Sequence, residues 1–326
     1  MTLVEYTTDP PTAAEALAAG RLVALPTETV YGLGARADLP HSIARVYAAK
    51  GRPADHPLIV HVRDKAALAA WARDVPDYAA DLADAAWPGP LTLVVRRSAR
   101  AGDHVTGGQD TVAVRVSSHP VMAAAMDALV DLVRDPAVGV AAPSANRFGR
   151  VSPTTAEHVR HELDEVLGDD DVVLDGGPSH VGVESTIVDC TGDRPVILRP
   201  GRVSADDVTA ITGLPVGHHS AVRAPGTLAS HYAPRARVAL VDAGALTDGD
   251  ATDATTGLLA LASVATPLGM VRLSAPDSAD AYAHALYASL READALGLTD
   301  VLAVPPSPQG IGAAVVDRLT RAAAGG

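Results

Sequence analysis

Short apolar segments of strand length alternate with helix-like stretches along this chain, and that alternation restricts its fold more than any other feature. In the first two hundred residues the strand-like segments are RLVAL (21–25), LIVHV (58–62), LTLVV (91–95), TVAVRV (111–116), VGVAA (138–142), VVLD (172–175), STIVD (185–189) and VILR (196–199). Apolar residues at helical spacing predict helices over 40–50 and 119–133. Because strands outnumber helices, the pattern predicts an α/β fold with a mixed sheet.

Local signals predict where several helices begin and end. Gly51 stands where a helix over 40–50 needs its C-terminal cap. Thr154 with Glu157 predicts a capping box that opens another helix. A short helix is expected between Ser204, as its N-cap, and Gly213.

The pattern changes after residue 213. The stretch LPVGHHSAVRAPGTLASHYAPRAR (214–237) has neither helical nor strand period, which is typical of a linker or a functional lid. Beyond it, VALV, GLLALA, MVRLS and DVLAVP alternate with helical stretches over 279–295 and 311–324, which predicts a small parallel α/β domain. With 326 residues, the chain is therefore divided into a first domain (1–203), an interdomain linker or lid (204–236) and a second domain (237–326).

Composition excludes several classes of protein. The formal net charge of -13 disfavours a protein that coats nucleic acid, because phosphate binding needs clustered cations. Cys190 is the only cysteine, so an internal disulfide and a thiolate metal cluster are excluded. No apolar run reaches the roughly 18 residues of a membrane span, and MTLVEYTTDP lacks the order of a signal peptide. A cytoplasmic protein is expected.

Gly32 to Ala37 match the dinucleotide-binding pattern G-x-G-x-x-A, but the context is wrong for it. That pattern needs its glycines at the turn between a strand and a helix, whereas PTETVY (26–31) intervenes after the strand and Pro40 delays the helix. The glycines are instead interpreted as turn residues. No G-x-x-x-x-G-K-[ST] occurs, so an ATP site of another kind is required.

Two polar segments flank these glycines. PTET (26–29) places two hydroxyls and a carboxylate just past a strand end, where open sheets bind ligands. Lys50 and Arg52 lie at a helix C-terminus, where the helix dipole alone favours cations, but together they also form a suitable phosphate clamp. Lys50 and Lys65 are the only lysines in the chain, which favours a specific need for a compact ammonium at Lys50. His56 and His61 nearby strengthen the functional interpretation.

Further polar groups punctuate the later strands. Arg115, within an apolar strand, needs either an internal ion pair or a bound carboxylate. APSAN (142–146) and GVEST (182–186) follow or begin strands with small and polar residues, and Arg199 adds a cation. His158 and His161 are interpreted as a solvated helix face, and Asp169 to Asp171 as a solvated turn. No G-x-S-x-G elbow is present, which disfavours covalent serine catalysis.

Taken in order, these segments resemble one family: the YrdC-like L-threonylcarbamoyladenylate synthases, in their long two-domain form. The segments that carry the resemblance are PTETVYGLG, KGRPADHPLIVHV, GPLTLVV, TVAVRV, APSAN followed by VSPT, ESTIVD, LRPG and the interdomain SHYAP. The resemblance implies a YrdC-like twisted mixed sheet with a concave active-site cavity, followed by a small Rossmann-like domain.

The resemblance also implies an activity: joining L-threonine, bicarbonate and ATP into threonylcarbamoyl-AMP with release of pyrophosphate. A separate transferase complex would then pass the threonylcarbamoyl group to an adenosine in tRNA. Magnesium would accompany ATP without a site built from protein side chains alone, and no tightly bound organic cofactor is implied. Neither a membrane nor direct nucleic-acid binding is expected.

By matching motifs, the resemblance assigns two groups of residues. Those expected around L-threonine are Thr29, His61, Arg115, the backbone of Ala142, and Ser185. Those expected at ATP are Lys50, Arg52, His56, Thr111, Ser144, Asn146, Ser152 and Arg199, with His231 and Tyr232 closing over the nucleotide. Lys50 and Arg52 are the expected catalytic cations.

This sequence departs from the family at two positions, where Ala54 stands in place of a common Ser and His56 in place of a common Asn. Two alternative functions stay open. One is carbamoyl transfer on the same fold, although such proteins carry zinc-finger and acylphosphatase-like modules for which this chain has neither cysteines nor length. The other is RNA binding, which the net charge disfavours.

Overall fold

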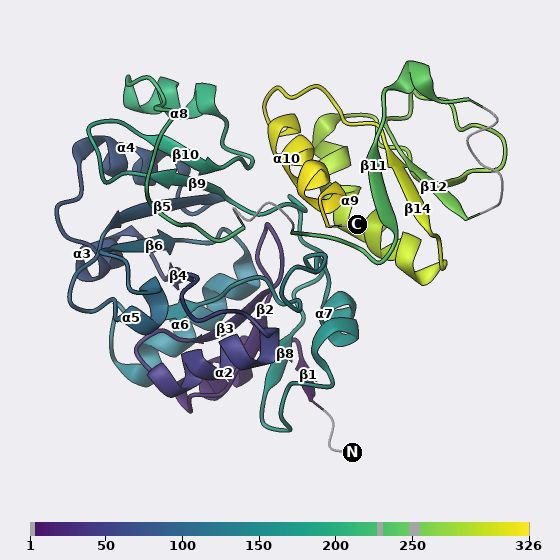
Figure 1. Cartoon of the computed structure of the whole chain (residues 1–326). Helices are drawn as coiled ribbons and strands as arrows, with labels where there is room; N and C mark the ends of the chain where they lie inside the picture. Colours follow the sequence, from purple (N-terminus) through teal and green to yellow (C-terminus); the bar gives the residue numbers. More distant parts are fainter. Residues whose placement is uncertain (1–3, 227–230, 248–254, 326) are drawn as a thin grey trace.

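Two β-sheets organise the chain (Figure 1). The computed structural model describes residues 4–226, 231–247 and 255–325. The first sheet has ten strands and is built from the N-terminal two hundred residues, and the second has four strands and is built from residues after 236. Part of the predicted linker, 227–230, lies outside the described residues. The exact domain boundaries stay a prediction.

The first sheet is mixed, as the sequence predicts. Its strand order is β1-β8-β2-β3-β7-β4-β6-β5-β9-β10. Its strands are β1 (Glu5–Thr7), β2 (Val23–Leu25), β3 (Gly32–Arg36), β4 (Ile59–Val62), β5 (Leu91–Arg96), β6 (Thr111–Arg115), β7 (Gly139–Ala141), β8 (Val172–Leu174), β9 (Thr186–Asp189) and β10 (Val196–Arg199). β4 pairs in parallel with β6 and antiparallel with β7, so both ladder types meet at the centre.

Helices cover both faces of this sheet. They are α1 (Pro10–Ala18), α2 (Pro40–Lys50), α3 (Leu68–Trp71), α4 (Asp77–Ala86), α5 (Asp103–Thr106), α6 (Pro120–Val133), α7 (Ala156–Leu163) and α8 (Ala205–Thr212). One apolar core joins α1 and α6 to β2, β7 and β8, and a larger one joins α2, α3 and α4 to the other face. Burial of these mostly aliphatic side chains is the main force that holds the layers together.

Most of the predicted helix ends are confirmed. α2 ends at Gly51 in the left-handed conformation, with φ 62°, and α8 opens with a capping box between Ser204 and Asp207. The prediction for α7 is wrong by one residue, because the N-cap is Thr155, whose hydroxyl accepts from the His158 amide. Thr154 instead contacts the His158 ring.

Two surface interpretations need correction. Asp171 is fully buried: its carboxylate accepts from the Leu22 amide and is paired with Arg45, so only Asp169 and Asp170 lie in an exposed turn. His158 is half-buried rather than solvated, whereas His161 is exposed.

The dinucleotide pattern is excluded by the structure, and so is the interpretation of its glycines as turn residues. Gly32 and Gly34 lie within β3, which pairs with β2 on one side and β7 on the other. A Cβ at Gly34 would lie 2.7 Å from Leu25 Cδ1 and 2.9 Å from Val140 Cγ1. The glycine therefore serves close packing inside the sheet.

The second sheet is wholly parallel, in the order β11-β14-β12-β13, which confirms the predicted small α/β unit. Its strands are β11 (Arg237–Leu240), β12 (Thr256–Leu259), β13 (Val271–Ser274) and β14 (Asp300–Ala303), and its helices are α9 (Ala279–Ala295) and α10 (Gly312–Ala323). α9 and α10 pack on each other and on one sheet face. In Figure 1 both helices lie on the side that faces the first sheet.

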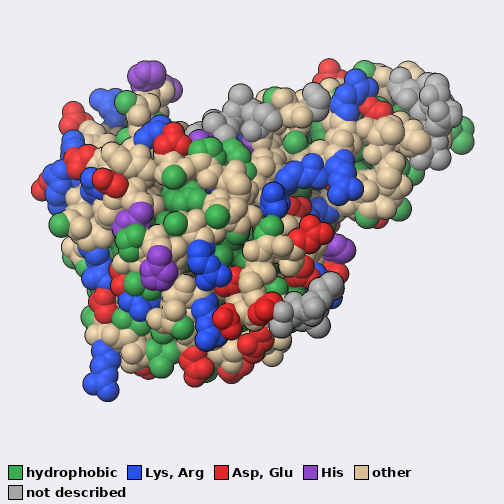
Figure 2. Space-filling view, turned by 60° about the horizontal axis from the view of Figure 1, so that its bottom comes forward, with side chains coloured by type: hydrophobic (Ala, Val, Ile, Leu, Met, Phe, Trp, Pro, Cys, Tyr) green, Lys and Arg blue, Asp and Glu red, His purple; other side chains and the backbone are tan. Residues whose placement is uncertain are grey.

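The distribution of charged side chains on the surface and the character of the helices agree with what the composition predicts. Acidic and basic side chains are interspersed over the face seen in Figure 2, rather than segregated by sign. Among the described residues, no helix combines the length and the apolar character that crossing a membrane requires.

We expect Gly34→Ala to lower the melting temperature, with a loss of about 1–3 kcal/mol, because an added methyl group has no room between β2 and β7. Gly192→Ala is the matched control, since nothing lies within 4 Å of its Cβ position. Thermal unfolding followed by circular dichroism measures both. Equal melting temperatures for the two variants would contradict the packing role of Gly34.

Candidate active site

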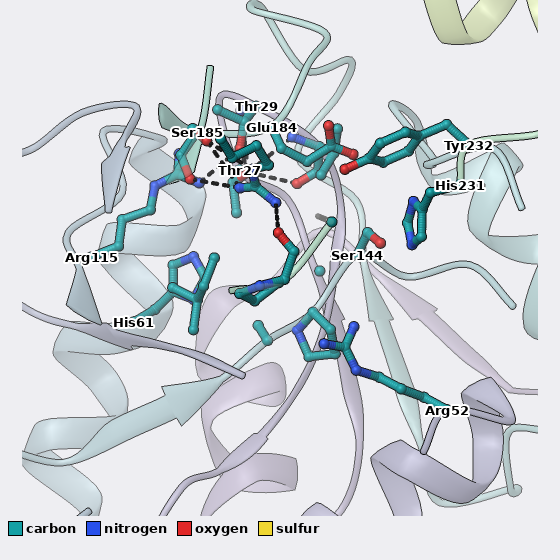
Figure 3. Close-up of a pocket in the computed structure, with 18 residues that line it drawn as sticks. Thr27, Thr29, Arg52, His61, Arg115, Ser144, Glu184, Ser185, His231 and Tyr232 are labelled. Carbon is teal, nitrogen blue, oxygen red and sulfur yellow. Dashed lines mark hydrogen bonds between the residues drawn. The ribbon is translucent and has the colours of Figure 1, made fainter. Parts of the chain in front are cut away.

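A small cavity lies where several strands of the first sheet end (Figure 3). Its volume is about 50 Å³. Predicted site residues that line it are Thr29, Arg52, His61, Arg115, Ala142, Ser144, Ser185, Arg199, His231 and Tyr232. Thr27, Val30, Gly32, Ile59, Pro143, Glu184, Pro225 and Gly226 complete the lining. Segments far apart in the sequence are thus brought to one site, as the motif order predicts.

The site has two sides. In Figure 3, His61 and Arg115 lie on one side, whereas Arg52, His231 and Tyr232 lie on the other. Ser144 lies between them, nearer the second side. This separation matches the predicted division between L-threonine and ATP, although those contacts themselves stay predictions.

Arg115 has the internal ion pair that the sequence left as one of two alternatives. Its guanidinium lies 2.7 Å from the Glu28 carboxylate and donates to Thr29 Oγ1 at 2.8 Å. Ser117 also donates to Glu28. Burial alone would raise the pKa of Glu28, but Arg115 and Ser117 lower it to about 2. Arg115 therefore holds the Thr29 hydroxyl in place, and the positive charge of Arg115 is balanced by the Glu28 carboxylate.

The turn at Thr27 presents Thr29 to the cavity. Thr27 Oγ1 donates to the Val30 carbonyl at 2.5 Å and accepts from the amides of Thr29 and Val30. The two threonine hydroxyls lie 2.9 Å apart. The Ser185 hydroxyl lies 2.7 Å from Thr92 Oγ1. The hydroxyls of Thr29 and Ser185 are thus both held by neighbours.

His61 is a buried imidazole with unused hydrogen-bonding capacity. Neither of its ring nitrogens has a partner among the described residues, although the side chain is only 3% exposed and lines the cavity. Burial, reinforced by the nearby Arg115 charge, lowers its pKa to about 3. A buried polar group without a partner is costly, which points to a ligand as the missing partner.

Arg52 and Arg199 supply positive charge on the other side. Arg52 donates to the Pro57 carbonyl, and Arg199 donates to the carbonyls of Ser185 and Pro225 and to the Ser185 hydroxyl. Neither forms an ion pair with a carboxylate in the described part of the chain. Burial lowers the pKa of Arg52 to about 10 and lowers that of Arg199. Both stay charged near neutral pH.

Lys50 is not aimed at the cavity. It is 2% exposed, and its Nζ donates to the carbonyls of Ser144 and Asn146 at 2.5 Å each. Burial, followed by repulsion from Arg52, holds the pKa of Lys50 well below its usual range. In this arrangement Lys50 holds the APSAN loop, and its predicted contact with phosphate stays a prediction.

Four other predicted ATP contacts also lie outside the lining. Asn146 donates to the carbonyls of Arg147 and Arg150, and Ser152 donates to Glu184. Thr111 pairs with Arg96 at the start of β6. His56 packs edge to face on Phe148, with ring centres 5.5 Å apart.

Glu184 is the main residue of the site to which sequence reasoning gave no role. Its carboxylate accepts from Ser152 at 2.6 Å, from the Tyr287 hydroxyl at 2.8 Å and from Arg318 Nε at 2.8 Å. Burial raises its pKa, but the charges of Arg318 and Arg199 lower it to about 2. The polar GVEST motif indicates a functional segment. No local signal in the sequence predicts that Glu184 contacts Tyr287 on α9 and Arg318 on α10.

Comparisons with known proteins agree with this geometry. A family model of Sua5, YciO and YrdC proteins, described as "Telomere recombination", matches residues 15–201. A second, described as "Threonylcarbamoyl-AMP synthase, C-terminal domain", matches residues 196–324.

Two relatives and one solved structure extend the comparison. The chain is 37% identical over 320 residues to threonylcarbamoyl-AMP synthase of Pyrococcus abyssi, covering 93% of this chain and 90% of that protein. It is 41% identical over 249 residues to threonylcarbamoyl-AMP synthase of Bacillus subtilis, covering 73% and 69%. A crystal structure of P. abyssi Sua5 complexed with L-threonine superposes with a TM-score of 0.84 at 33% identity, covering 99% of this chain and 98% of that one.

The buried histidines predict a pH dependence of stability. Burial lowers the pKa of His61 and His231 to about 3 and that of His158 to about 4, whereas an unfolded histidine titrates near 6.5. Between these values the unfolded chain binds more protons, so stability falls as pH decreases. We expect the melting temperature to decline from about pH 6.5 toward about pH 4.

Two variants test the cause. His158→Gln should flatten part of this decline, because it removes one proton-binding group of the unfolded chain. His219→Gln, at an exposed histidine, is the control and should leave the profile unchanged. A His158→Gln profile that matches the wild type would rule out this explanation.

Proposed function

Because the chain belongs to the Sua5/YciO/YrdC family and resembles the threonylcarbamoyl-AMP synthases through its C-terminal domain, we propose that it makes threonylcarbamoyl-AMP. The substrates are L-threonine, bicarbonate and ATP, and pyrophosphate is released. The threonylcarbamoyl group is destined for tRNA.

The observation that carries this proposal is the unequal balance of charge across the cavity. Arg115 forms an ion pair with Glu28, whereas neither Arg52 nor Arg199 lies within ion-pair distance of a carboxylate in the described structure, and their hydrogen bonds go to carbonyl and hydroxyl groups. Burying a cation without a directly paired carboxylate is unfavourable, and an anionic ligand offsets that cost. The phosphates of ATP provide such an anion on the side of Arg52 and Arg199.

The other side suits a small amino acid. The hydroxyls of Thr29 and Ser185, the Arg115 guanidinium, the neutral His61 ring and the Ala142 backbone border it. A hydrogen-bonding site of this kind favours a substrate with a hydroxyl group over one without it, because unpaired buried polar groups are costly. The crystal structure of P. abyssi Sua5 complexed with L-threonine supports threonine as the amino acid substrate.

His61 acts as a hydrogen-bond partner rather than as the base. With a pKa of about 3, it is a poor acceptor for a proton from an ammonium group that titrates near pH 8. The threonine nitrogen must be uncharged to form its bond to the carbon of bicarbonate. One C–O bond of bicarbonate breaks in this step, and that oxygen leaves as water with the proton that the nitrogen gives up. The surrounding low-dielectric cavity favours that uncharged amine.

The second step needs positioning and cations more than a protein nucleophile. A carbamate oxygen attacks the α-phosphorus in line, and the bond to the pyrophosphate oxygen breaks. Arg52 and Arg199 stabilise the negative charge that builds up on the phosphates. A closed cavity also protects the carbamate from water.

Magnesium belongs with ATP in this proposal. Among the described residues no group of three histidine, cysteine, aspartate or glutamate side chains could hold a metal ion. Arg52 and Arg199, the cations that border the nucleotide side, suit phosphates rather than a free cation. When bound, magnesium would supply charge neutralisation to the triphosphate.

Pro225, Gly226, His231 and Tyr232 of the predicted linker line the cavity. In this proposal the linker opens for the nucleotide and closes over it, as the family resemblance implies. Release of the product to a separate transferase complex, in the cytoplasm, completes the proposed role.

The proposal is tested by measuring pyrophosphate release with L-threonine, bicarbonate and ATP, each omitted in turn. Omission of any one substrate should reduce release to background, because both bonds must form before pyrophosphate leaves. Retention of full release without threonine would show a different ATP-consuming reaction.

Arg52→Ala should lower kcat/KM for ATP at least about 10-fold, roughly 1.4 kcal/mol, because a cation is removed from the phosphate side. Arg52→Lys should lose less, since it keeps the charge. Arg63→Ala, at an exposed ion pair with Asp127, is the control and should retain the wild-type rate. An unchanged kcat/KM in Arg52→Ala would remove Arg52 from the nucleotide site.

A further inference from the structure

One arginine of the second sheet's helices contacts three separate segments that form or support the wall of the cavity. Arg318 lies on α10, and its side chain is 0% exposed. It reaches the GVEST segment, the segment that follows Arg199, and the SHYAP segment. The first two segments are joined by the pairing of β9 with β10, and Arg318 links both of them to the SHYAP segment, which is distant in the sequence.

The contacts use the whole guanidinium. Nε donates to Glu184 at 2.8 Å, and one terminal nitrogen donates to the Pro200 carbonyl at 3.0 Å. The other donates to Asp317 on the same helix at 2.5 Å. The guanidinium carbon also lies 5.1 Å from the centre of the Tyr232 ring, within the range of a cation–π interaction.

Each of these partners leads directly to a group in the cavity. Glu184 lines the cavity itself and precedes Ser185, whose carbonyl and hydroxyl accept from Arg199. Pro200 follows Arg199 in the chain. Tyr232 lines the cavity in a left-handed conformation, with φ 64°, which an aromatic residue adopts only when its surroundings hold it there.

We propose that Arg318 is a positioning residue for the synthase reaction: it sets Glu184, Arg199 and Tyr232 in the arrangement that the two substrates need. This inference rests on the proposed function. It also gives the second sheet and its helices a role in the reaction, because the wall of the cavity is fixed from α10.

A purely structural role for Arg318 makes a different prediction, and Arg291 supplies the comparison. Arg291 on α9 forms a similar ion pair with Glu162 on α7, at 3.1 Å, and both side chains are largely buried. Its other partner is the Val151 carbonyl. It therefore joins the same two parts of the chain, but neither of these partners lines the cavity.

The experiment compares Arg318→Met, Arg318→Lys and Arg291→Met in the full-length chain. We measure kcat and KM for ATP and L-threonine in the pyrophosphate assay, below the melting temperature of each variant. Arg318→Met should lose about 10- to 100-fold in kcat/KM, since misplacement of binding groups by about 1 Å can cost this much. Arg318→Lys should recover part of the loss, and Arg291→Met should stay within about twofold of the wild type.

A readout independent of turnover separates positioning from folding. Amide hydrogen exchange should accelerate at residues 182–186, 199–201 and 231–233 in Arg318→Met but not in Arg291→Met. The double variant Glu184→Gln/Arg318→Met should regain stability over Arg318→Met, because no buried carboxylate is left unpaired, without regaining kcat/KM.

The outcomes are distinguishable. If the wild type releases no threonine-dependent pyrophosphate, the proposed function fails. If the wild type is active and Arg318→Met matches it, or if Arg291→Met loses as much as Arg318→Met, the positioning role is overturned. Recovery of both stability and kcat/KM in the double variant would also reduce Arg318 to a structural contact.

Discussion

The buried carboxylate of Glu184 joins the two parts of this chain at the wall of the cavity. Removing a carboxylate from water costs several kcal/mol unless donors replace the lost hydration. Ser152 provides one donor from the first part of the chain, and Tyr287 and Arg318 provide two from α9 and α10. Because the site and this anchor share one side chain, the cavity cannot be understood from the first sheet alone.

The buried arginines near this carboxylate differ in whether they form an ion pair. Arg115 is paired with Glu28, so its charge is balanced and it acts mainly to orient Thr29. Arg52 and Arg199 form hydrogen bonds to carbonyl and hydroxyl groups but no ion pair with a carboxylate among the described residues, so their charge is left for an anion. The same residue type thus prepares one side of the cavity for a neutral or zwitterionic group and the other for phosphates.

Local features could be predicted from the sequence, and long-range contacts could not. The ends of the predicted strands agree with the structure to within three residues, because alternation and apolar runs are local signals. β3 was missed, because glycines in GLGAR suggest a turn and only tertiary packing makes them strand residues. Glu184 and Arg318 are separated by 134 residues. Neither the helical period nor the spacing within a motif can predict a contact over such a separation.

Lys50 shows how one signal in the sequence can serve the fold of a site as well as its ligand. A chain with only one other lysine, Lys65, keeps a lysine there, and two backbone carbonyls converge on its one nitrogen at 2.5 Å. A planar guanidinium spreads its donors over a wider fork and could not place both bonds on a single atom. The partners in the structure are the carbonyls of Ser144 and Asn146, so the lysine shapes the loop that separates the two sides of the cavity, and its contact with phosphate stays a prediction. Sequence can therefore specify the kind of charge that a site needs, while the fold decides whether that charge faces the ligand or the chain.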